Sequence, residues 1–177
     1  MENYIEITND SWDYYFMRIA RDVGMNSKCL SKHIGSVLVK DKHIIATGYN
    51  GPPSGIPPCF VRLDDGTYTD DNSFVSEVCP RTRMGFGSGK GLEHCPAVHS
   101  EVNTIIQAAK FGTSTLNATL YCDCGIPCHN CAKEIINAGI IRVVCSENSK
   151  YAGSLSSIDS EWLFSKAGII LNLLPMR

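Results

Sequence analysis

The hydrophobic pattern of the first fifty residues predicts a helix followed by a β-hairpin. Apolar side chains recur at helical spacing over residues 11–23, with Asp10 or Ser11 as a cap and Gly24 at the end. Two short apolar runs, 35–39 and 44–47, flank the polar residues 40–43 and predict two antiparallel strands. The second strand runs into the sequence Gly-Tyr-Asn-Gly over residues 48–51.

After residue 98 the pattern alternates between helical and strand periods. Helices are expected from His99 to a stop at Gly112, over 128–138, and over 159–167. Strands are expected over 118–122, 141–145 and 169–173. Strands that alternate with helices favour an α/β sandwich whose second half is largely parallel.

Residues 51–98 lack any sustained period. This stretch holds six of the eight prolines and seven of the fifteen glycines. A loop of that length inside a compact domain is improbable unless something staples it or it performs a task. The chain of 177 residues has the length of one domain, so we interpret 51–98 as a long insertion in it.

Composition and charge exclude several classes of protein. Sixteen Lys and Arg against eighteen Asp and Glu give a net charge of -2, without the basic excess typical of proteins that bind a nucleic acid polymer. No apolar run reaches the length of about 18 residues that spans a membrane, and the acidic start is unlike a secretory signal. We therefore expect a cytoplasmic protein, in which nine cysteines indicate metal binding or thiol chemistry.

Two short motifs, each at the start of a predicted helix, carry the candidate chemistry. One is His99-Ser-Glu101 and the other is Pro-Cys128-His-Asn-Cys131. One imidazole and two thiolates supply three ligands of a catalytic zinc site and leave the fourth position for water. Glu101, two residues beyond the histidine, is placed to miss the metal and to move a proton to and from that water.

Each motif alone is weak evidence. A lone C-x-x-C is as often a redox pair or half of a structural zinc site, and H-x-E occurs by chance in many chains. Together, H-x-E followed by P-C-x-x-C is the signature of zinc-dependent nucleobase deaminases.

With these motifs the chain resembles the deoxycytidylate deaminase family. The resemblance covers most of the chain and includes Gly-Tyr-Asn-Gly at 48–51, Asn103, and the stretch 132–139 after the second motif. It implies a single deaminase domain over 1–177 with the insertion at 51–98. The implied fold is a three-layer α-β-α sandwich around a mixed sheet of about five strands, the cytidine deaminase fold.

The resemblance also implies the reaction and its catalytic residues. His99, Cys128 and Cys131 would bind one catalytic Zn²⁺, and Glu101 would be the proton shuttle. The enzyme would hydrolyse dCMP to dUMP and ammonia, which supplies dUMP for dTMP synthesis. The implied oligomer is a homohexamer.

Substrate and effector sites follow from the same resemblance. Asn50 would contact the deoxyribose, and Ser100, Asn103 and Lys110 would lie at the substrate. The effectors dCTP, an activator, and dTTP, an inhibitor, would bind with Mg²⁺ near Gly48, Tyr49, Asn50 and Gly51. The chain departs from the family where Lys110 replaces a common arginine and where the segment between Tyr121 and Pro127 is one residue longer.

The remaining cysteines leave alternatives open. A second, structural zinc would explain how the insertion holds together, and its candidate ligands are Cys59, Cys79, His94 and Cys95, with Cys29 as a further ligand. The alternative is that these thiols are small buried apolar groups. Cys122, Cys124 and Cys145 are interpreted as packing residues. Arg81, Arg83 and Lys90 either meet a nucleotide phosphate or form a solvated face.

Three functions compete at this point. The first is deamination of free dCMP, with dCTP as a further substrate. The second is deamination of a base in tRNA or single-stranded DNA, which needs a basic and aromatic surface. The third is a zinc-binding module without activity. The net charge and the Gly-Tyr-Asn-Gly run favour the first, and Glu101 argues against the third.

Overall fold

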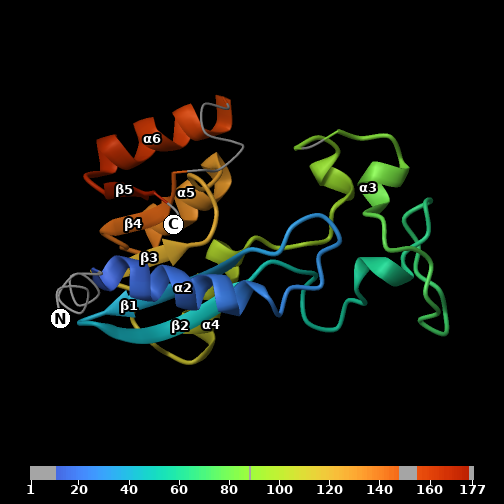
Figure 1. Cartoon of the computed structure of the whole chain (residues 1–177), viewed down its shortest axis with the longest axis horizontal. Helices are drawn as coiled ribbons and strands as arrows, with labels where there is room; N and C mark the ends of the chain where they lie inside the picture. The colour runs from blue at the N-terminus through green and yellow to red at the C-terminus, as the bar shows by residue number, and fades with distance from the viewer. Residues whose placement is uncertain (1–10, 88, 148–154, 176–177) are drawn as a thin grey trace, which may run out of the picture.

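A five-stranded mixed sheet runs through the middle of the molecule (Figure 1). The computed structural model describes residues 11–87, 89–147 and 155–175. The strands are β1 (Gly35–Lys40), β2 (His43–Tyr49), β3 (Thr119–Cys122), β4 (Arg142–Ser146) and β5 (Ile170–Leu174), in the spatial order β2-β1-β3-β4-β5. β1 is antiparallel to β2 and β3, whereas β3, β4 and β5 are parallel. The predicted hairpin and parallel second half are confirmed.

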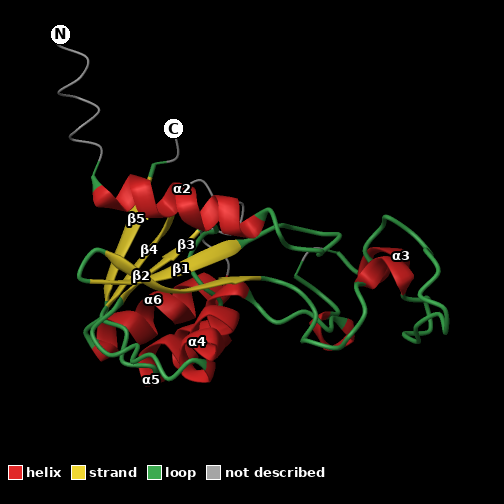
Figure 2. Cartoon of the chain, turned by 90° about the horizontal axis from the view of Figure 1, so that it is seen from below, coloured by secondary structure: helices red, strands yellow, loops and turns green. Residues whose placement is uncertain are grey.

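Helices cover both faces of this sheet. Figure 2 shows α2 (Trp12–Gly24) on one face and α4 (Ser100–Lys110), α5 (His129–Asn137) and α6 (Leu155–Ala167) on the other. The result is the expected three-layer α-β-α sandwich. α6 begins four residues earlier than the predicted helix, and Asp10, one of the two predicted caps of α2, lies outside the described residues.

The alternation of side chains along the strands builds one core on each face. Val37 and Val39 of β1 pack with Phe16 and Met17 of α2, whereas Leu38 between them packs into the cluster beneath α4, α5 and α6. Successive residues of a strand point to opposite faces, so the three consecutive apolar residues 37–39 of β1 require helices on both sides. Burying each large side chain contributes about 1.5–3 kcal/mol.

The insertion at 51–98 stands beside the sandwich (Figure 1). It contains three short helical turns, η1 (Cys59–Val61), α3 (Pro80–Arg83) and η2 (Leu92–His94). Its two ends meet in an isolated bridge, in which Gly51 N–H donates to Val98 O at 3.1 Å and Val98 N–H donates to Gly51 O at 2.8 Å. The insertion therefore leaves and rejoins the sandwich at one point.

Arginine side chains connect the turns of the insertion from within. Arg83 donates to Arg62 O and forms an ion pair with Asp64 at 2.9 Å. Arg81 donates to Lys90 O at 2.5 Å. These contacts commit the guanidinium groups of Arg81 and Arg83 to the loop itself, which supports a structural role for them over phosphate binding.

Among the described residues, no helix combines the length and the apolar character needed to cross a bilayer.

Candidate metal centre

One edge of the sheet gathers the candidate site. Gly35 at the start of β1 pairs with Tyr49 at the end of β2, and the neighbouring Ser36 pairs with Cys122 at the end of β3. α4 and α5 both begin at this edge, because α5 follows β3 directly and α4 packs against β1 and β2. The carboxyl ends of parallel strands are where α/β folds place their ligands.

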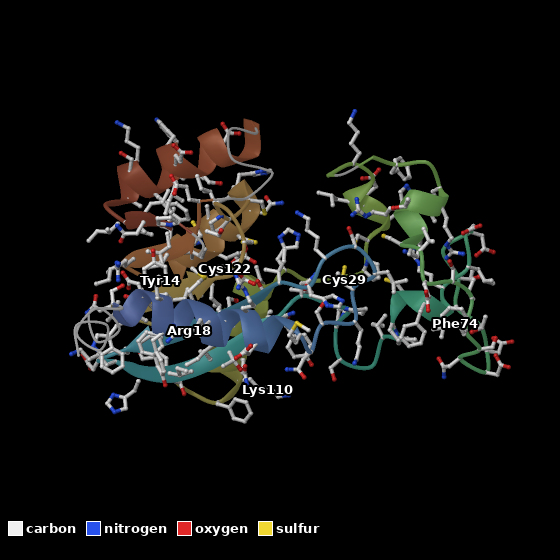
Figure 3. All side chains as sticks on the ribbon, in the orientation of Figure 1. Tyr14, Arg18, Cys29, Phe74, Lys110 and Cys122 are labelled. Atoms are coloured by element: carbon white, nitrogen blue, oxygen red, sulfur yellow. The ribbon has the colours of Figure 1, made fainter. Side chains whose placement is uncertain are left out.

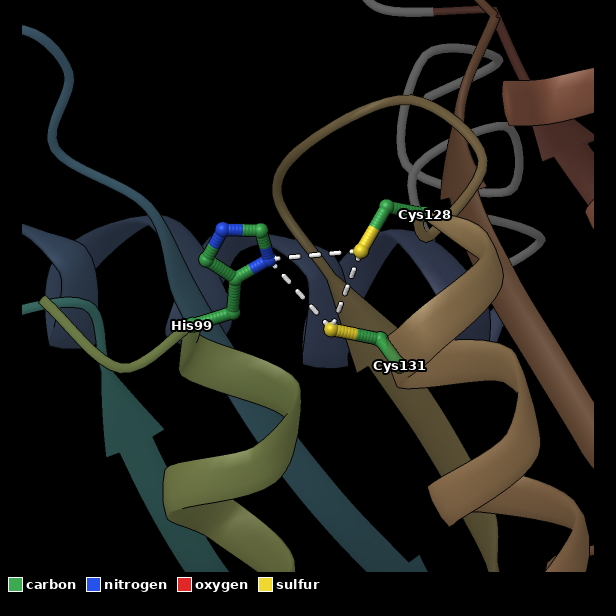
Figure 4. Close-up of side chains that lie close together, drawn as sticks. All are labelled: His99, Cys128 and Cys131. Atoms are coloured by element: carbon green, nitrogen blue, oxygen red, sulfur yellow. Dashed lines mark hydrogen bonds between the residues drawn. The ribbon is translucent and has the colours of Figure 1, made fainter. Parts of the chain in front are cut away.

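The three predicted metal ligands converge between the starts of α4 and α5 (Figure 4). His99 and Cys128 are the N-cap residues of the two helices, and Cys131 lies in the first turn of α5. His99 Nδ1 is 3.5 Å from Cys128 Sγ and 3.3 Å from Cys131 Sγ, and the two sulfur atoms are 3.5 Å apart. The C-x-x-C spacing places both sulfurs on one side of a single helical turn.

The dimensions of this triangle fit a zinc ion. With zinc–sulfur bonds of about 2.3 Å and a zinc–nitrogen bond of about 2.0 Å, tetrahedral geometry requires edges of about 3.8 Å between sulfurs and about 3.6 Å between sulfur and nitrogen. The observed edges are within a few tenths of an ångström of these values. One imidazole and two thiols are also the donor set of a zinc site with an open fourth position.

The electrostatics of the triangle favour metal binding. The neighbouring Cys131 thiol and His99 lower the pKa of Cys128 to about 3, against the effect of burial. The Cys128 sulfur raises the pKa of His99 to about 9. The Cys131 pKa is raised by Cys128 and by burial. The lowered pKa of Cys128 favours its thiolate form, and the positive ends of two helix dipoles favour that negative charge.

Glu101 is buried beside the triangle, with 4% of its surface exposed. Burial raises its pKa, and the charge of His99 opposes that effect. Ser100, which is completely buried, donates its hydroxyl to Glu101 Oε2 at 3.0 Å. The Ser100 side chain thus contacts the Glu101 carboxylate, whereas the resemblance places Ser100 at the substrate.

Asn50, predicted to contact the deoxyribose, is engaged with the protein backbone. Its Oδ1 accepts the Ile34 N–H at 2.9 Å, and its Nδ2 donates to Lys32 O at 2.9 Å. Ser27 Oγ donates to Asn50 O at 2.7 Å. The side chain is 7% exposed. Asn50 therefore holds the loop before β1, a role that its motif did not indicate.

The other predicted substrate residues divide between the site and its surroundings. Asn103 Nδ2 donates to Tyr49 O at 2.8 Å and ties α4 to the Gly-Tyr-Asn-Gly turn. Gly48 in that turn touches α4 so closely that an added Cβ would lie 2.5 Å from Thr104 N. Lys110 ends α4 (Figure 3), about 15 Å along the helix from its start, so the structure does not bring it to the metal centre.

A cavity of about 490 Å³ lies against the loop that Asn50 holds. It is lined by Cys29, Leu30, Ser31, Lys32, His33 and Glu77. Because this loop leads directly into β1, the cavity lies toward the same edge of the sheet as the start of that strand. Its lining combines Lys32 and His33 with the carboxylate of Glu77.

The sequence did not predict a second group of ligand-type side chains at Glu101. Cys122 at the end of β3 (Figure 3) and Cys124 in the following bend have sulfur atoms 3.1 Å apart. Together with a carboxylate oxygen of Glu101, their ligand atoms all lie within 4.8 Å of one another. The C-x-C spacing was visible in the sequence, but nothing there placed it next to Glu101.

Three further cysteines from separate segments lie around Cys59. Burial, and then Cys95, Cys29 and Cys79 in that order, raise the pKa of the Cys59 thiol to about 11. His94, also predicted as a ligand here, stacks its ring on Phe86 and lies 3.8 Å from a Glu93 carboxylate oxygen. In the groups of His99 and of Glu101, the ligand atoms all lie within 4.8 Å of one another. Among the described residues, the ligand atoms around Cys59 do not lie that close together.

Comparison with known proteins gives consistent matches. Residues 10–147 match the family model "Cytidine and deoxycytidylate deaminase zinc-binding region". Deoxycytidylate deaminase of Saccharomyces cerevisiae is 35% identical over 138 residues, which is 78% of this chain and 38% of the relative. The deoxycytidylate deaminase of Mycobacterium phage D29 is 32% identical over 148 residues, 81% of this chain and 100% of the relative.

Solved structures share the fold. The dCMP deaminase of cyanophage S-TIM5, crystallised with dCMP and dUMP, superposes with a TM-score of 0.63 at 23% identity and covers 90% of this chain and 94% of that one. The chain spans less than two fifths of the length of its relatives in Saccharomyces cerevisiae and Schizosaccharomyces pombe. With the family match extending over both ligand motifs, the chain belongs to the cytidine and deoxycytidylate deaminase family.

Proposed function

We propose that this protein is a zinc-dependent deaminase that hydrolyses dCMP to dUMP and ammonia. The observation that carries the proposal is the triangle of His99, Cys128 and Cys131 with the buried Glu101 beside it. Relatives named deoxycytidylate deaminase, at 32–35% identity, support the choice of substrate.

The chain's own residues account for the proton movements. Zinc held by His99, Cys128 and Cys131 would supply Lewis-acid activation of water near neutral pH. Glu101 accepts one proton from the water as its oxygen bonds to C4 of the cytosine, and delivers that proton to N3. Glu101 then takes the second proton from the new C4 hydroxyl and delivers it to the amino group, the C4–N4 bond breaks, and ammonia leaves. Ser100 holds one carboxylate oxygen and leaves the other for this transfer.

The cavity beside β1 supports a nucleotide over a free nucleoside. A monophosphate requires at least one cationic partner, and Lys32 and His33 line the cavity. Asn50 fixes the backbone on both sides of His33 through its two amide hydrogen bonds. In the proposal this loop binds the 5′-phosphate, so Asn50 acts on the substrate through the loop.

A substrate panel tests the proposal. The protein is incubated with dCMP, dCTP, cytidine and a cytosine-containing single-stranded oligonucleotide, and the uracil products are quantified. Turnover of dCMP above the others is the expected result. Turnover confined to the oligonucleotide would establish the polymer-editing alternative, and turnover of dCTP alone would reassign the substrate.

The proposal also includes regulation and assembly, on the family resemblance, and the dCMP assay with added dCTP or dTTP tests the regulation. We expect dCTP with Mg²⁺ to raise the rate and dTTP to lower it, through the turn at 48–51. A homohexamer is expected. This assembly is supported by four large apolar side chains on or next to the helices that leave half or more of their surface exposed: Trp12, Ile106, Phe111 and Trp162. Light scattering of the purified protein measures the mass directly.

We further propose a structural zinc bound by Cys29, Cys59, Cys79 and Cys95. The raised pKa of Cys59, caused by burial and by the nearby Cys95, Cys29 and Cys79 thiols, supports this set. The Phe86 and Glu93 contacts of His94 favour replacing it by Cys29. Such a metal would fasten the insertion to the loop that lines the cavity. Metal analysis is expected to give two zinc ions per chain for the parent and one for Cys59→Ser. A value of one for both would exclude the structural zinc.

A further inference from the structure

The sulfur pair at Cys122 and Cys124 is placed where it can interfere with Glu101. Cys122 is completely buried at the end of β3, and Cys124 follows in a bend and is partly exposed. Cys122 Sγ is also 3.5 Å from Ser100 Oγ, the hydroxyl that donates to Glu101. Cys124 Sγ lies 3.0 Å from Gly125 O. Neither thiol is needed for the reaction as derived above.

These three side chains form a compact donor set for a thiophilic cation. Two sulfurs and one carboxylate oxygen lie within 4.8 Å of one another, and thiolates select soft d¹⁰ cations such as zinc. A tetrahedral zinc requires about 3.8 Å between its sulfur ligands, so the present 3.1 Å must open by a few tenths of an ångström. Cys124 can make that movement because it lies in a bend and not in the sheet.

We infer that Glu101, Cys122 and Cys124 form a second, inhibitory binding site for a thiophilic divalent cation. The inference rests on the proposed function in one respect, the role of Glu101 as the proton carrier. A cation held by both thiolates takes the Glu101 carboxylate as its third ligand. Proton transfer to the substrate then stops, while His99, Cys128 and Cys131 keep their own metal.

Excess Zn²⁺ is the probe, because it cannot exchange the resident metal for a different one. Protein purified under reducing conditions with its resident zinc is incubated with Zn²⁺, passed over a desalting column, and analysed for zinc per chain. Cys124→Ala removes one sulfur ligand at a partly exposed position. Cys145→Ala is the matched control, since Cys145 pairs with Cys122 in the sheet and is a buried thiol outside the donor set.

The parent and Cys145→Ala are expected to gain one zinc that Cys124→Ala does not gain. At saturating Zn²⁺ their dCMP turnover should fall by about 100-fold or more, the contribution of a general acid–base group, while Cys124→Ala changes by less than about twofold. The loss should appear in kcat with KM unchanged, and a chelator should restore activity.

Equal zinc gain and equal inhibition in the parent and Cys124→Ala would overturn the inference. Cys122→Ala provides an independent second variant, and circular dichroism confirms that each variant is folded. The zinc count does not depend on turnover, so it tests this site even if dCMP proves not to be the substrate. Conversely, a parent that deaminates dCMP but gains no zinc removes only the second site.

Discussion

Glu101 lies in an environment suited to the proposed role of a carboxylate that both accepts and donates a proton. Burial raises its pKa from the ordinary value, and the His99 charge and the Ser100 hydroxyl pull it back down. A general acid–base group works best when its pKa lies near the working pH. The same environment would make a permanently charged glutamate costly, because an unpaired buried charge is strongly destabilising.

Glu101→Gln is expected to keep the fold and the metal while abolishing deamination. The amide has nearly the same shape but cannot carry the proton, so ammonia release should fall by about 100-fold or more. Zinc content and the unfolding midpoint are measured beside the rate. A variant that deaminates at the parent rate would refute the role given to Glu101.

Asn50→Asp is expected to weaken substrate binding more than it slows the chemical step. The carboxylate can still accept the Ile34 N–H but faces the Lys32 carbonyl without a proton to donate, so the loop loses one of its two anchors. Leaving a buried acceptor unsatisfied costs about 1–3 kcal/mol. KM for dCMP should rise about tenfold or more for 1.4 kcal/mol lost at the loop.

The comparison for Asn50 is Asn103→Asp. This change disturbs the hydrogen bond from Asn103 on α4 to Tyr49 O at the end of β2, and leaves the loop before β1 unchanged. If both variants raise KM equally, the loop has no special part in binding the phosphate.

At the scale of single residues, the sequence predicts those features that depend on spacing within one short segment. The spacing of Cys128 and Cys131 and the position of His99 at a helix start were enough to predict three converging ligands. The resemblance places Asn50, Ser100 and Lys110 at the substrate, but a motif gives no information on the chain segments that fold against it. Helix length separates Lys110 from His99.

Among the secondary-structure elements, α2 is fastened to the sheet by a charged network as well as by its apolar face. Asp13 of α2 accepts hydrogen bonds from Arg142 of β4 at 2.7 and 2.8 Å and from Tyr121 of β3 at 2.8 Å. The Arg142 contact is the main cause that lowers the pKa of Asp13, against the effect of burial. One carboxylate thus joins a helix to two neighbouring strands.

The hydrogen bonds of Asp13 should make the free energy of unfolding depend on pH. Because the folded-state pKa lies below the unfolded one, the network's contribution is complete above about pH 4 and is lost as pH falls through the folded pKa. Asp13→Asn is expected to lower the unfolding free energy by about 1.5–3 kcal/mol at pH 7. The difference from the parent should shrink below about pH 4.

Chemical denaturation at several pH values measures this dependence. Asp22→Asn, an exposed carboxylate on the same helix, is the reference and should cost less than about 0.5 kcal/mol. A constant difference between Asp13→Asn and the parent down to pH 3 would contradict the role of the carboxylate charge.

Most elements could be predicted because their signal is a period within one segment. The apolar run 37–39 in β1 and the helix stops at Gly24, Gly112 and Gly139 are examples. The early part of α6 lacked such a signal, since its sequence near residue 155 is rich in serine. The hydrophobic pattern does not predict the order of the strands in the sheet, because that order depends on which segments far apart in the sequence pair with each other.

The whole molecule divides into a sandwich with two apolar cores and an insertion with few apolar residues buried in it. Cys59, Cys79 and Val61 are buried there, whereas Phe74, Ile56 and Leu92 are largely exposed. A segment that buries so little apolar surface has to be held by polar contacts or by a metal. The domain assignment over 1–177 and the structural zinc both remain predictions.

Chelation is expected to loosen the insertion before the sandwich. Removing zinc from the proposed cysteine set releases the four segments that carry these cysteines from one another. Hydrogen bonds alone then order the insertion, so protease cuts should appear first within 51–98. Mass spectrometry of the early fragments locates the cuts. Re-addition of Zn²⁺ should restore resistance. First cuts within α4 or α5 would place the loosened region at the catalytic motifs instead.

The meeting of Gly51 and Val98 also bears on how such a chain can vary. Since the two ends of the insertion are already hydrogen-bonded to each other, the chain between them can be shortened or lengthened at little entropic cost. The sandwich and its candidate metal centre would tolerate an insertion of different sequence or length between Gly51 and Val98. Differences in length among relatives should therefore accumulate between these two residues, and a graft made there should leave the scaffold intact.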